Sequence, residues 1–282
     1  MTGLPAAVRG RVVAEAVRRR EPSIPTGPHA RAFAEAFAGL DVLLRDLSSE
    51  EWATTVVHDW DVQQTVVHLM AGDGAVCAAA CVPEAIRLPA YDGPFASMRE
   101  FGGPVGEWEG RSRYIMARHH GRPYRMSWHA WRAQARSLLK CRAARERDET
   151  PVEYAGRTLP LADAYLARGF ETWLHADDIG RAVGRPFPEP SSEPMALLVE
   201  LGVTTLGLLK AEIGARLVLE GPGAVTVALG GGEAQAELRL SSSDFCRLLG
   251  GNRRADEIAV VVQGDTETAA AALAAVASLA IL

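Results

Sequence analysis

A stretch rich in proline and serine, residues 184–194 (GRPFPEPSSEP), separates two parts of this 282-residue chain that differ in their hydrophobic pattern. Before it, long segments fit the helical period. After it, short runs alternate apolar and polar residues, as strands do. Because such a stretch interrupts regular structure, it is typical of a linker between domains. We therefore predict an α+β protein, with a helical bundle over residues 1–190 and a smaller α/β domain over residues 191–282.

The helices expected in the first part follow a proline-containing lead-in, residues 20–28, and are interrupted by residues 84–110, which we predict to be irregular. The second of them has a clear start, because Asp61 is a good N-cap and Gln64 completes a capping box. The expected helices cover residues 29–47, residues from 62 to a point before Pro83, most of 111–147 with a break near Gly121–Pro123, and residues 160–183.

The second part is expected to alternate helices with short strands. Period-2 alternation of apolar residues in AVTVALG (224–230) and in the end of EAQAELRLS (233–241) supports this prediction. The expected order is a helix within 195–212, strands within 215–221, 224–230 and 233–241, a short helix over 243–251, a strand within 257–264 and a last helix over about 266–278.

Charge and composition limit the partners that we expect. The net charge is −5 and lies entirely in residues 191–282, which argues against a nucleic-acid partner. No run reaches the roughly 18 apolar residues of a membrane span, and the N-terminus lacks the pattern of a signal peptide. Four cysteines are too few for a disulfide scaffold in a chain of this length. We expect a reduced, cytoplasmic protein that binds neither nucleic acid nor a membrane.

Residues 111–147 contain ten arginines and one lysine, with Tyr114, Tyr124, Trp128 and Trp131 between them. Basic and aromatic residues interleaved in this way could bind nucleic acid by charge and stacking. The arginines could instead hold an anionic substrate. We favour a third interpretation, a solvated helix face whose charge is balanced by acidic residues elsewhere in the first part.

A carboxylate and an imidazole lie one helical turn apart in RGFETWLHADDIGRAVGRP, residues 168–186. Residues four apart on a helix project from one face, so Glu171 and His175 share a stripe that Asp178 continues. Alanines share the stripe and bulky side chains point elsewhere, which leaves space beside groups that can bind a metal. Such a pair arises often by chance, so the prediction of a metal site depends on a third ligand.

His68 is the candidate for that ligand, because it falls outside the main apolar face of its helix and beside small residues. The alternative is a core histidine that is hydrogen-bonded to a neighbour. His68, Glu171 and His175 together would leave one coordination position open, as catalytic metal sites do. The set suits zinc best, with iron, nickel and cobalt as alternatives. Asp178 and Asp73 could orient the histidines by accepting their hydrogen bonds. The alternative for each is an ordinary carboxylate on the helix surface or at a helix cap.

Two motifs, DWDVQQTVVHLMAGD (59–73) and GFETWLHADDIGRAVGRP (169–186), resemble those of the mycothiol-dependent maleylpyruvate isomerase family, which belongs to the DinB-like metalloenzyme superfamily. The resemblance implies a four-helix bundle in which a divalent metal is held by His68 on the second helix and by Glu171 and His175 on the last. Residues 238–273 are similar to the sterol-carrier-like C-terminal domain that follows many of these bundles.

The resemblance also implies an activity, in which a metal-activated thiolate attacks a small electrophilic metabolite. The enzyme would be a cis–trans isomerase if the thiol leaves again, or an S-transferase of specialised metabolism if the thiol stays on the product. The implied cofactors are a divalent metal and mycothiol as thiol cosubstrate. Asp178 and Arg254 are the candidate catalytic residues and Arg253 is the candidate thiol-binding residue, if the loop GNRRAD closes over the site of the bundle.

Two other classes of function remain open at this point. The same scaffold could be a metal-dependent hydrolase or lyase that uses metal-bound water. It could also be a non-enzymatic ligand-binding or regulatory protein with a vestigial site. Bacillithiol or glutathione would fit the thiol chemistry as well as mycothiol does, and the sequence predicts neither the electrophile nor an oligomeric state.

Overall fold

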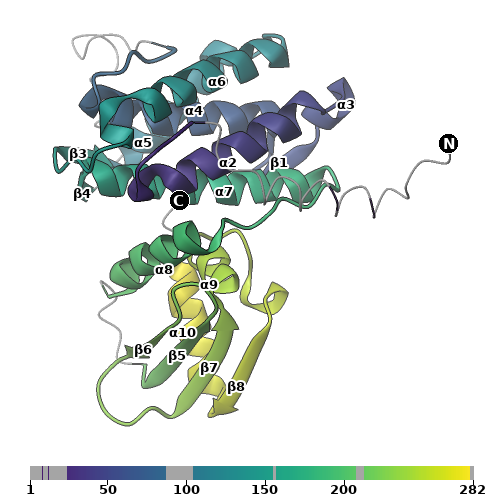
Figure 1. Ribbon diagram of the computed structural model, residues 1–282. Helices are drawn as coiled ribbons and strands as arrows, with labels where there is room; N and C mark the ends of the chain where they lie inside the picture. The colour runs from purple at the N-terminus through teal and green to yellow at the C-terminus, as the bar shows by residue number, and fades with distance from the viewer. Residues whose placement is uncertain are drawn as a thin grey trace. The chain divides into compact units, whose positions relative to one another are not determined.

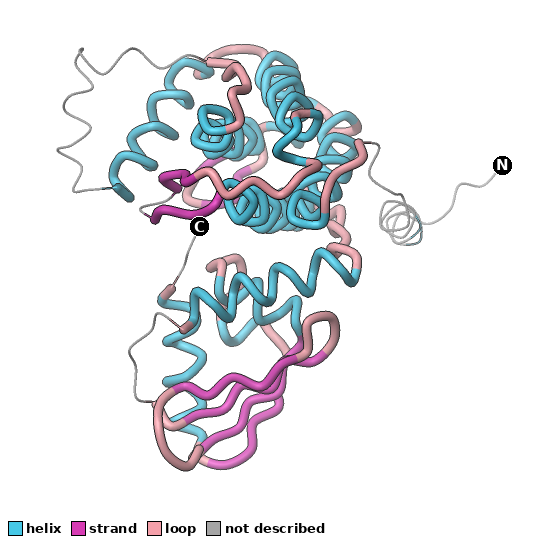
Figure 2. The backbone as a smooth tube through the Cα atoms, turned by 60° about the vertical axis from the view of Figure 1, so that its left-hand side comes forward, coloured by secondary structure: helices cyan, strands magenta, loops and turns pink. Residues whose placement is uncertain are grey.

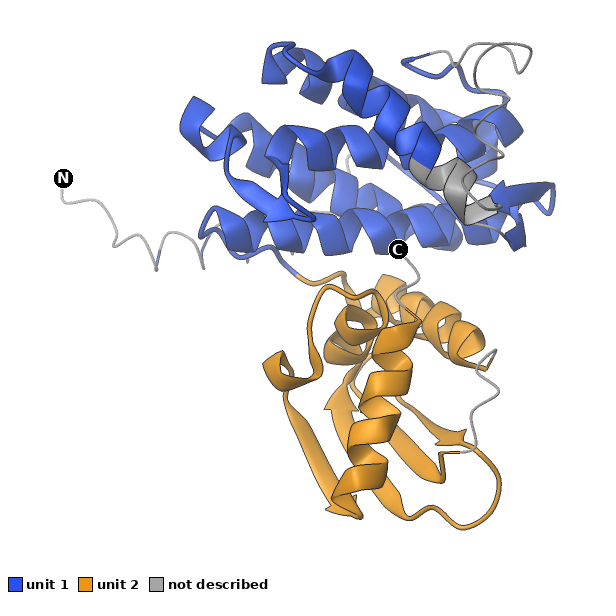
Figure 3. Ribbon diagram, turned by 180° about the vertical axis from the view of Figure 1, so that it is seen from behind, with its two compact units in different colours: residues 1–188 blue, residues 189–282 orange. Residues whose placement is uncertain are grey.

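The computed structural model describes residues 8, 12, 24–86, 104–154, 157–207 and 213–279. The chain divides into two compact units, residues 1–188 and 189–282 (Figure 3). The first unit is mainly helical, and the second packs helices against a small sheet (Figure 1). This confirms the predicted α+β class, with a helical N-terminal part and a small C-terminal sheet domain. Residues 20–23 of the expected lead-in and residues 87–103 of the expected irregular segment lie outside the described residues.

Four long helices of the first unit form the bundle. They are α2 (Pro28–Arg45), α4 (Val62–Ala79), α6 (Tyr124–Lys140) and α7 (Leu161–Ala182). Each packs against the next, because α2 contacts α7, α7 contacts α4, α4 contacts α6 and α6 contacts α2. A further helix, α5 (Pro104–His119), packs on α4. The unit also contains short helical turns, α3 (Ser49–Trp52) and the 3-10 helix η2 (Arg142–Ala144).

The helix boundaries follow local signals. The Asp61 carboxylate accepts a hydrogen bond from the backbone N–H of Gln64, and the Gln64 side chain accepts one from the N–H of Asp61, which confirms the predicted capping box. Gly121, in the left-handed region at φ 72°, lies in the predicted break between α5 and α6. The prediction for residues 104–110 is wrong, because α5 begins at Pro104, a residue that fits the first turn of a helix.

Two β-hairpins of the first unit were not predicted from the sequence. One joins β1 (Thr55–Val57) to β2 (Trp60–Asp61), and the other joins β3 (Pro151–Tyr154) to β4 (Arg157–Pro160). These strands are too short to show a clear alternation of apolar and polar residues. Figure 2 shows both hairpins as short magenta segments beside the cyan helices of the bundle.

Helix α7 is buried around its whole circumference. Every residue from Leu161 to Gly180 is buried except Asp163. The polar stripe that contains Glu171 and His175 therefore lies inside the bundle and is not a solvated face. Because buried polar groups need partners, the positions of these side chains are fixed by what they contact.

The second unit has a four-stranded sheet in the order β6-β5-β7-β8, in which β5 and β7 are parallel and the other neighbours antiparallel. Its elements are α8 (Ser192–Leu206), β5 (Ala215–Glu220), β6 (Val225–Leu229), β7 (Ala236–Ser241), α9 (Ser242–Leu249), η3 (Ala255–Glu257), β8 (Val260–Gly264) and α10 (Thr266–Ser278). The face that bears Leu217 and Leu238 is buried, whereas Arg216 and Glu237 pair on the other face. Helix α8 ends at Leu206, before the expected end, and residues 208–212 are outside the described residues.

No helix in the ranges that the structure describes is both long and apolar enough to span a membrane.

Gly169 sets the distance between α7 and α2. A Cβ atom at this position would lie 2.6 Å from the backbone nitrogen of Phe33 and 2.7 Å from the Cβ of Ala32, both on α2. Such a contact with backbone cannot be relieved by moving a flexible side chain. Residue 169 precedes Glu171 by two positions, so the close approach of these helices also positions the polar stripe.

We expect Gly169→Ala to lower the free energy of unfolding by about 1–3 kcal/mol, because overpacking outweighs the gain of about 1 kcal/mol in helix propensity. Urea unfolding of the purified protein measures the change. Gly207→Ala is the control, since this exposed glycine at the end of α8 has helical φ and ψ and its Cβ would meet only its own preceding turn. A midpoint for Gly169→Ala equal to or above that of the wild type would contradict this packing account.

Candidate metal centre

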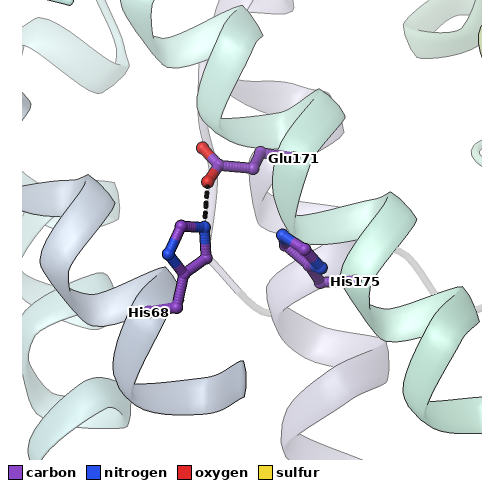
Figure 4. A group of neighbouring side chains, drawn as sticks. All are labelled: His68, Glu171 and His175. Atoms are coloured by element: carbon purple, nitrogen blue, oxygen red, sulfur yellow. Dashed lines mark hydrogen bonds and ion pairs between the residues drawn. The ribbon is translucent and has the colours of Figure 1, made fainter. Parts of the chain in front are cut away.

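Three side chains that can bind a metal meet between α4 and α7. His68 projects from α4, and Glu171 and His175 project from successive turns of α7. One possible ligand atom from each lies within 4.8 Å of the other two. Figure 4 shows the His68 ring and the Glu171 carboxylate facing one another, with one ring nitrogen of His175 directed to the same space. The structure thus brings together the three ligands predicted from the sequence.

The two oxygens of Glu171 have different partners. Oε1 accepts a hydrogen bond from Nε2 of His68 at 2.9 Å. Oε2 accepts one from the hydroxyl of Tyr154 at 2.8 Å and another from NH1 of Arg168. Tyr154 and Arg168 were missed by the sequence analysis. The position of Arg168 could have indicated its role, because it places a charge three residues before Glu171 in an apolar helix. Tyr154 lies in a short strand that nothing in the sequence linked to the site.

Arg168 is fully buried and joins α7 to α4. Its Nε donates to Oδ1 of Asp73 at 2.8 Å, and its NH2 donates to the backbone oxygen of Leu69 at 2.9 Å. The prediction that Asp73 orients a histidine is therefore wrong. Asp73 lies five residues after His68, more than one helical turn, and accepts hydrogen bonds from Arg168 and Gln134 instead.

Asp73, Arg168 and Glu171 form a buried cluster whose charges do not cancel. Burial raises the pKa of Asp73 to about 6 even though Arg168 opposes the shift, so this carboxylate is ionised at pH 7. Burial would also raise the pKa of Glu171, but the charge of Arg168 and the hydrogen bond from His68 outweigh it and hold that pKa well below its usual range. Two carboxylates and one guanidinium leave a net charge of −1 in the interior. Because buried charge needs compensation, the cluster favours a cation.

His68 has a partner on each ring nitrogen and an aromatic neighbour. Its Nδ1 lies 3.1 Å from Oγ of Ser112 on α5, and its ring centre lies 5.0 Å from that of Trp60 on β2. A serine hydroxyl can donate or accept. It can therefore serve the tautomer that donates from Nε2 to Glu171 and also the tautomer whose Nε2 is free for a metal. Burial lowers the pKa of His68, which keeps the ring neutral and able to bind a metal.

Trp60 reaches this position because the β1–β2 hairpin turns sharply. His58 and Asp59 both adopt left-handed backbone conformations, with φ of 51° and 62°. Positive φ at two consecutive turn residues is the geometry of the tight two-residue turns that suit antiparallel strands. The turn directs the chain back so that Trp60 comes to lie beside α4.

His175 lies beside Asp178, the second acidic residue of the stripe. Its Nδ1 is buried, has no hydrogen-bond partner and is 3.6 Å from Oδ2 of Asp178. The other oxygen of Asp178 accepts a hydrogen bond from Arg181 at 2.6 Å. Asp178 is thus placed where it could orient His175, and its role in catalysis stays a prediction.

The residues present fit a divalent cation. Two imidazoles and one carboxylate are ligands of the type that zinc, iron and nickel accept. The buried cluster carries net negative charge, and two of the possible ligand atoms face one another at hydrogen-bond distance. A metal would take the place of the proton that Glu171 and His68 share.

The two arginines predicted to act from the C-terminal part lie in the second unit, between α9 and β8. Arg253 donates hydrogen bonds to Asn252. The guanidinium of Arg254 is exposed and pairs with both oxygens of Asp256, while its backbone N–H is capped by Glu257. The predicted roles of Arg253 in thiol binding and of Arg254 in catalysis stay predictions.

Two solved structures are similar to this chain, and both are of the mycothiol-dependent maleylpyruvate isomerase, one of them a mutant with alanine in place of a histidine. Each has a TM-score of 0.56, with 15% and 16% sequence identity, and each match covers 92% of this chain and 95% of the other. The chain therefore has the fold of this isomerase over most of its length, as the resemblance of its motifs implied. No protein-family model and no curated protein matches the chain.

The lowered pKa of His68 predicts how the stability of the metal-free protein depends on pH. When the folded pKa lies below that of the unfolded chain, the unfolded state takes up a proton first. The contribution of neutral His68 to stability is complete at a pH above its unfolded-state pKa of about 6.5. This contribution is lost as the pH falls below that pKa. We expect the melting temperature of the wild type in EDTA to fall more steeply than that of His68→Gln between about pH 7.5 and pH 5.5. Parallel curves for the two proteins would contradict the assignment.

Proposed function

We propose that this chain is a metal-dependent enzyme that uses mycothiol as a cosubstrate, either as a cis–trans isomerase or as an S-transferase, and acts on a small electrophilic metabolite. The observation that carries the proposal is the convergence of His68, Glu171 and His175 between α4 and α7. A fold shared with a mycothiol-dependent isomerase over 92% of the chain supports the choice of thiol.

The chemistry of thiols explains why such a site is useful. A free thiol has a pKa of about 8.5 and is mostly neutral at pH 7, whereas its thiolate is the nucleophile. A divalent metal, when bound, would supply a Lewis acid that keeps a coordinated thiol ionised. His68, Glu171 and His175 would hold it and leave one position open for the thiol.

The surrounding side chains have separate tasks in this proposal. Ser112 supports whichever tautomer of His68 the bound state requires, and Asp178 would fix the ring of His175. Trp60 places an apolar ring beside His68, which would shield that side of the site from water. Zinc is the metal that we propose, because two imidazoles and one carboxylate are a common ligand set for it; iron and nickel are the alternatives.

We expect the purified wild-type protein to carry close to one zinc, iron or nickel ion per chain. Glu171→Gln and His175→Ala should each lose most of it, because two remaining ligands bind a divalent ion weakly. Elemental analysis after dialysis measures the content, and circular dichroism shows whether the variants are folded. A wild type that holds no metal, and takes up none when zinc, iron or nickel is added back, would contradict the proposal.

We expect the loaded enzyme to consume mycothiol or to require it as a catalyst with small conjugated electrophiles. The rate should fall by at least about 100-fold in His68→Ala, since losing a ligand should cost more than the 10–100-fold typical of an outer hydrogen-bond partner. Assays with and without thiol measure this. Turnover in thiol-free buffer would instead favour a metal-dependent hydrolase or lyase, and unchanged function in Glu171→Gln would favour a binding protein with a vestigial site.

A further inference from the structure

The carboxylate of Glu171 is asymmetric in its surroundings, and this bears on how it would bind a metal. Oε1 faces His68, which is a ligand in the proposed site. Oε2 faces away from that histidine and accepts hydrogen bonds from both Tyr154 and Arg168. A carboxylate can bind a metal through one or both oxygens. Each carboxylate oxygen has about two lone-pair sites, so an oxygen that already accepts two hydrogen bonds has no site free for a metal.

Both donors on Oε2 are fixed as donors. The arginine guanidinium stays protonated in proteins. The phenol of a tyrosine is likewise protonated at pH 7, so its hydroxyl can donate. Tyr154 is almost completely buried, and Arg168 is completely so, which leaves neither free to swing away into solvent. The two hydrogen bonds on Oε2 would therefore persist when Oε1 binds a metal.

Arg168 also sets the distance between the two helices that bear the ligands. The guanidinium that contacts Glu171 donates to the backbone oxygen of Leu69, the residue that follows His68 on α4. A third contact, to Asp73, lies about one turn further along α4. One planar group therefore connects the carboxylate on α7 to the backbone of α4 beside His68. Lysine could not replace it, because an ammonium lacks the planar fork that makes these contacts together.

We propose that Arg168 and Tyr154 are positioning residues that restrict Glu171 to binding the metal through Oε1 alone, and that Arg168 sets the spacing between Glu171 and His68. This inference rests on the proposed metal site. Single-oxygen binding gives three protein ligand atoms in all, so a fourth position stays open for the thiol. A Glu171 that bound through both oxygens would fill or crowd that position.

Cobalt(II) tests the proposal, because the intensity of its visible absorption falls as its coordination number rises from four to five. The full-length protein is freed of metal and titrated with cobalt(II), and three variants are compared with the wild type. Tyr154→Phe removes one donor to Oε2, and Arg168→Lys removes the fork. Tyr165→Phe is the matched control. Tyr165 lies on α7, the helix that bears Glu171, and its buried hydroxyl bonds to Leu138 and Cys141 and not to Glu171.

We expect Tyr154→Phe to bind one cobalt ion per chain with weaker visible absorption than the wild type, because Glu171 then binds through both oxygens and the coordination number rises. Arg168→Lys should bind cobalt about 10–100-fold more weakly than the wild type. Tyr165→Phe should match the wild type in both measurements. If Tyr154 served only in packing, Tyr154→Phe would lower the stability of the protein without changing the cobalt spectrum.

Three results would decide against parts of this account. If Tyr154→Phe and Arg168→Lys both keep the spectrum and affinity of the wild type, the positioning role is wrong while the proposed metal site stands. If the wild type binds no cobalt and no zinc, the proposed function fails and this inference fails with it. If Arg168→Lys does not fold, Tyr154→Phe decides alone, and an unchanged spectrum in that variant overturns the restriction of Glu171 to one oxygen.

Discussion

Burial of the Glu171 carboxylate beside the Arg168 guanidinium is the interaction on which the first unit depends. Two ionised groups taken out of water are costly unless their remaining hydrogen-bonding atoms also find partners. Here Asp73 and the Leu69 carbonyl on α4 satisfy the rest of the guanidinium, and Tyr154 on β3 satisfies the carboxylate. Helices α4 and α7 and the β3–β4 hairpin must therefore meet at this point in the bundle.

This constraint explains how a buried helix can also carry chemistry. Helix α7 packs closely on α2 through Gly169 and presents Glu171 and His175 toward α4. A site built on packed helices holds its groups more precisely than one built on loops. The cluster keeps one net negative charge after Arg168 is counted. The same residues that stabilise the interior thus create a place for a cation, with Trp60 and Ser112 around His68.

Local signals in the sequence were sufficient for part of this structure. The spacing of Glu171 and His175 follows from helix geometry alone, and the start of α4 follows from Asp61 and Gln64. Partners across the bundle could not be predicted in this way, because the face that a residue occupies does not say which helix packs opposite. Asp73 was therefore assigned to a histidine although it pairs with Arg168. Tyr154 was missed because its strand has four residues and no clear apolar period.

Anomalous diffraction from crystals of the zinc-loaded protein, recorded on both sides of the zinc absorption edge, is the most direct test of the central claim. We expect one strong peak per chain within about 2.0–2.2 Å of a ring nitrogen of His68, a ring nitrogen of His175 and Oε1 of Glu171. Oε2 should keep its hydrogen bonds to Tyr154 and Arg168. A peak at another position, or no peak between α4 and α7, would contradict the account.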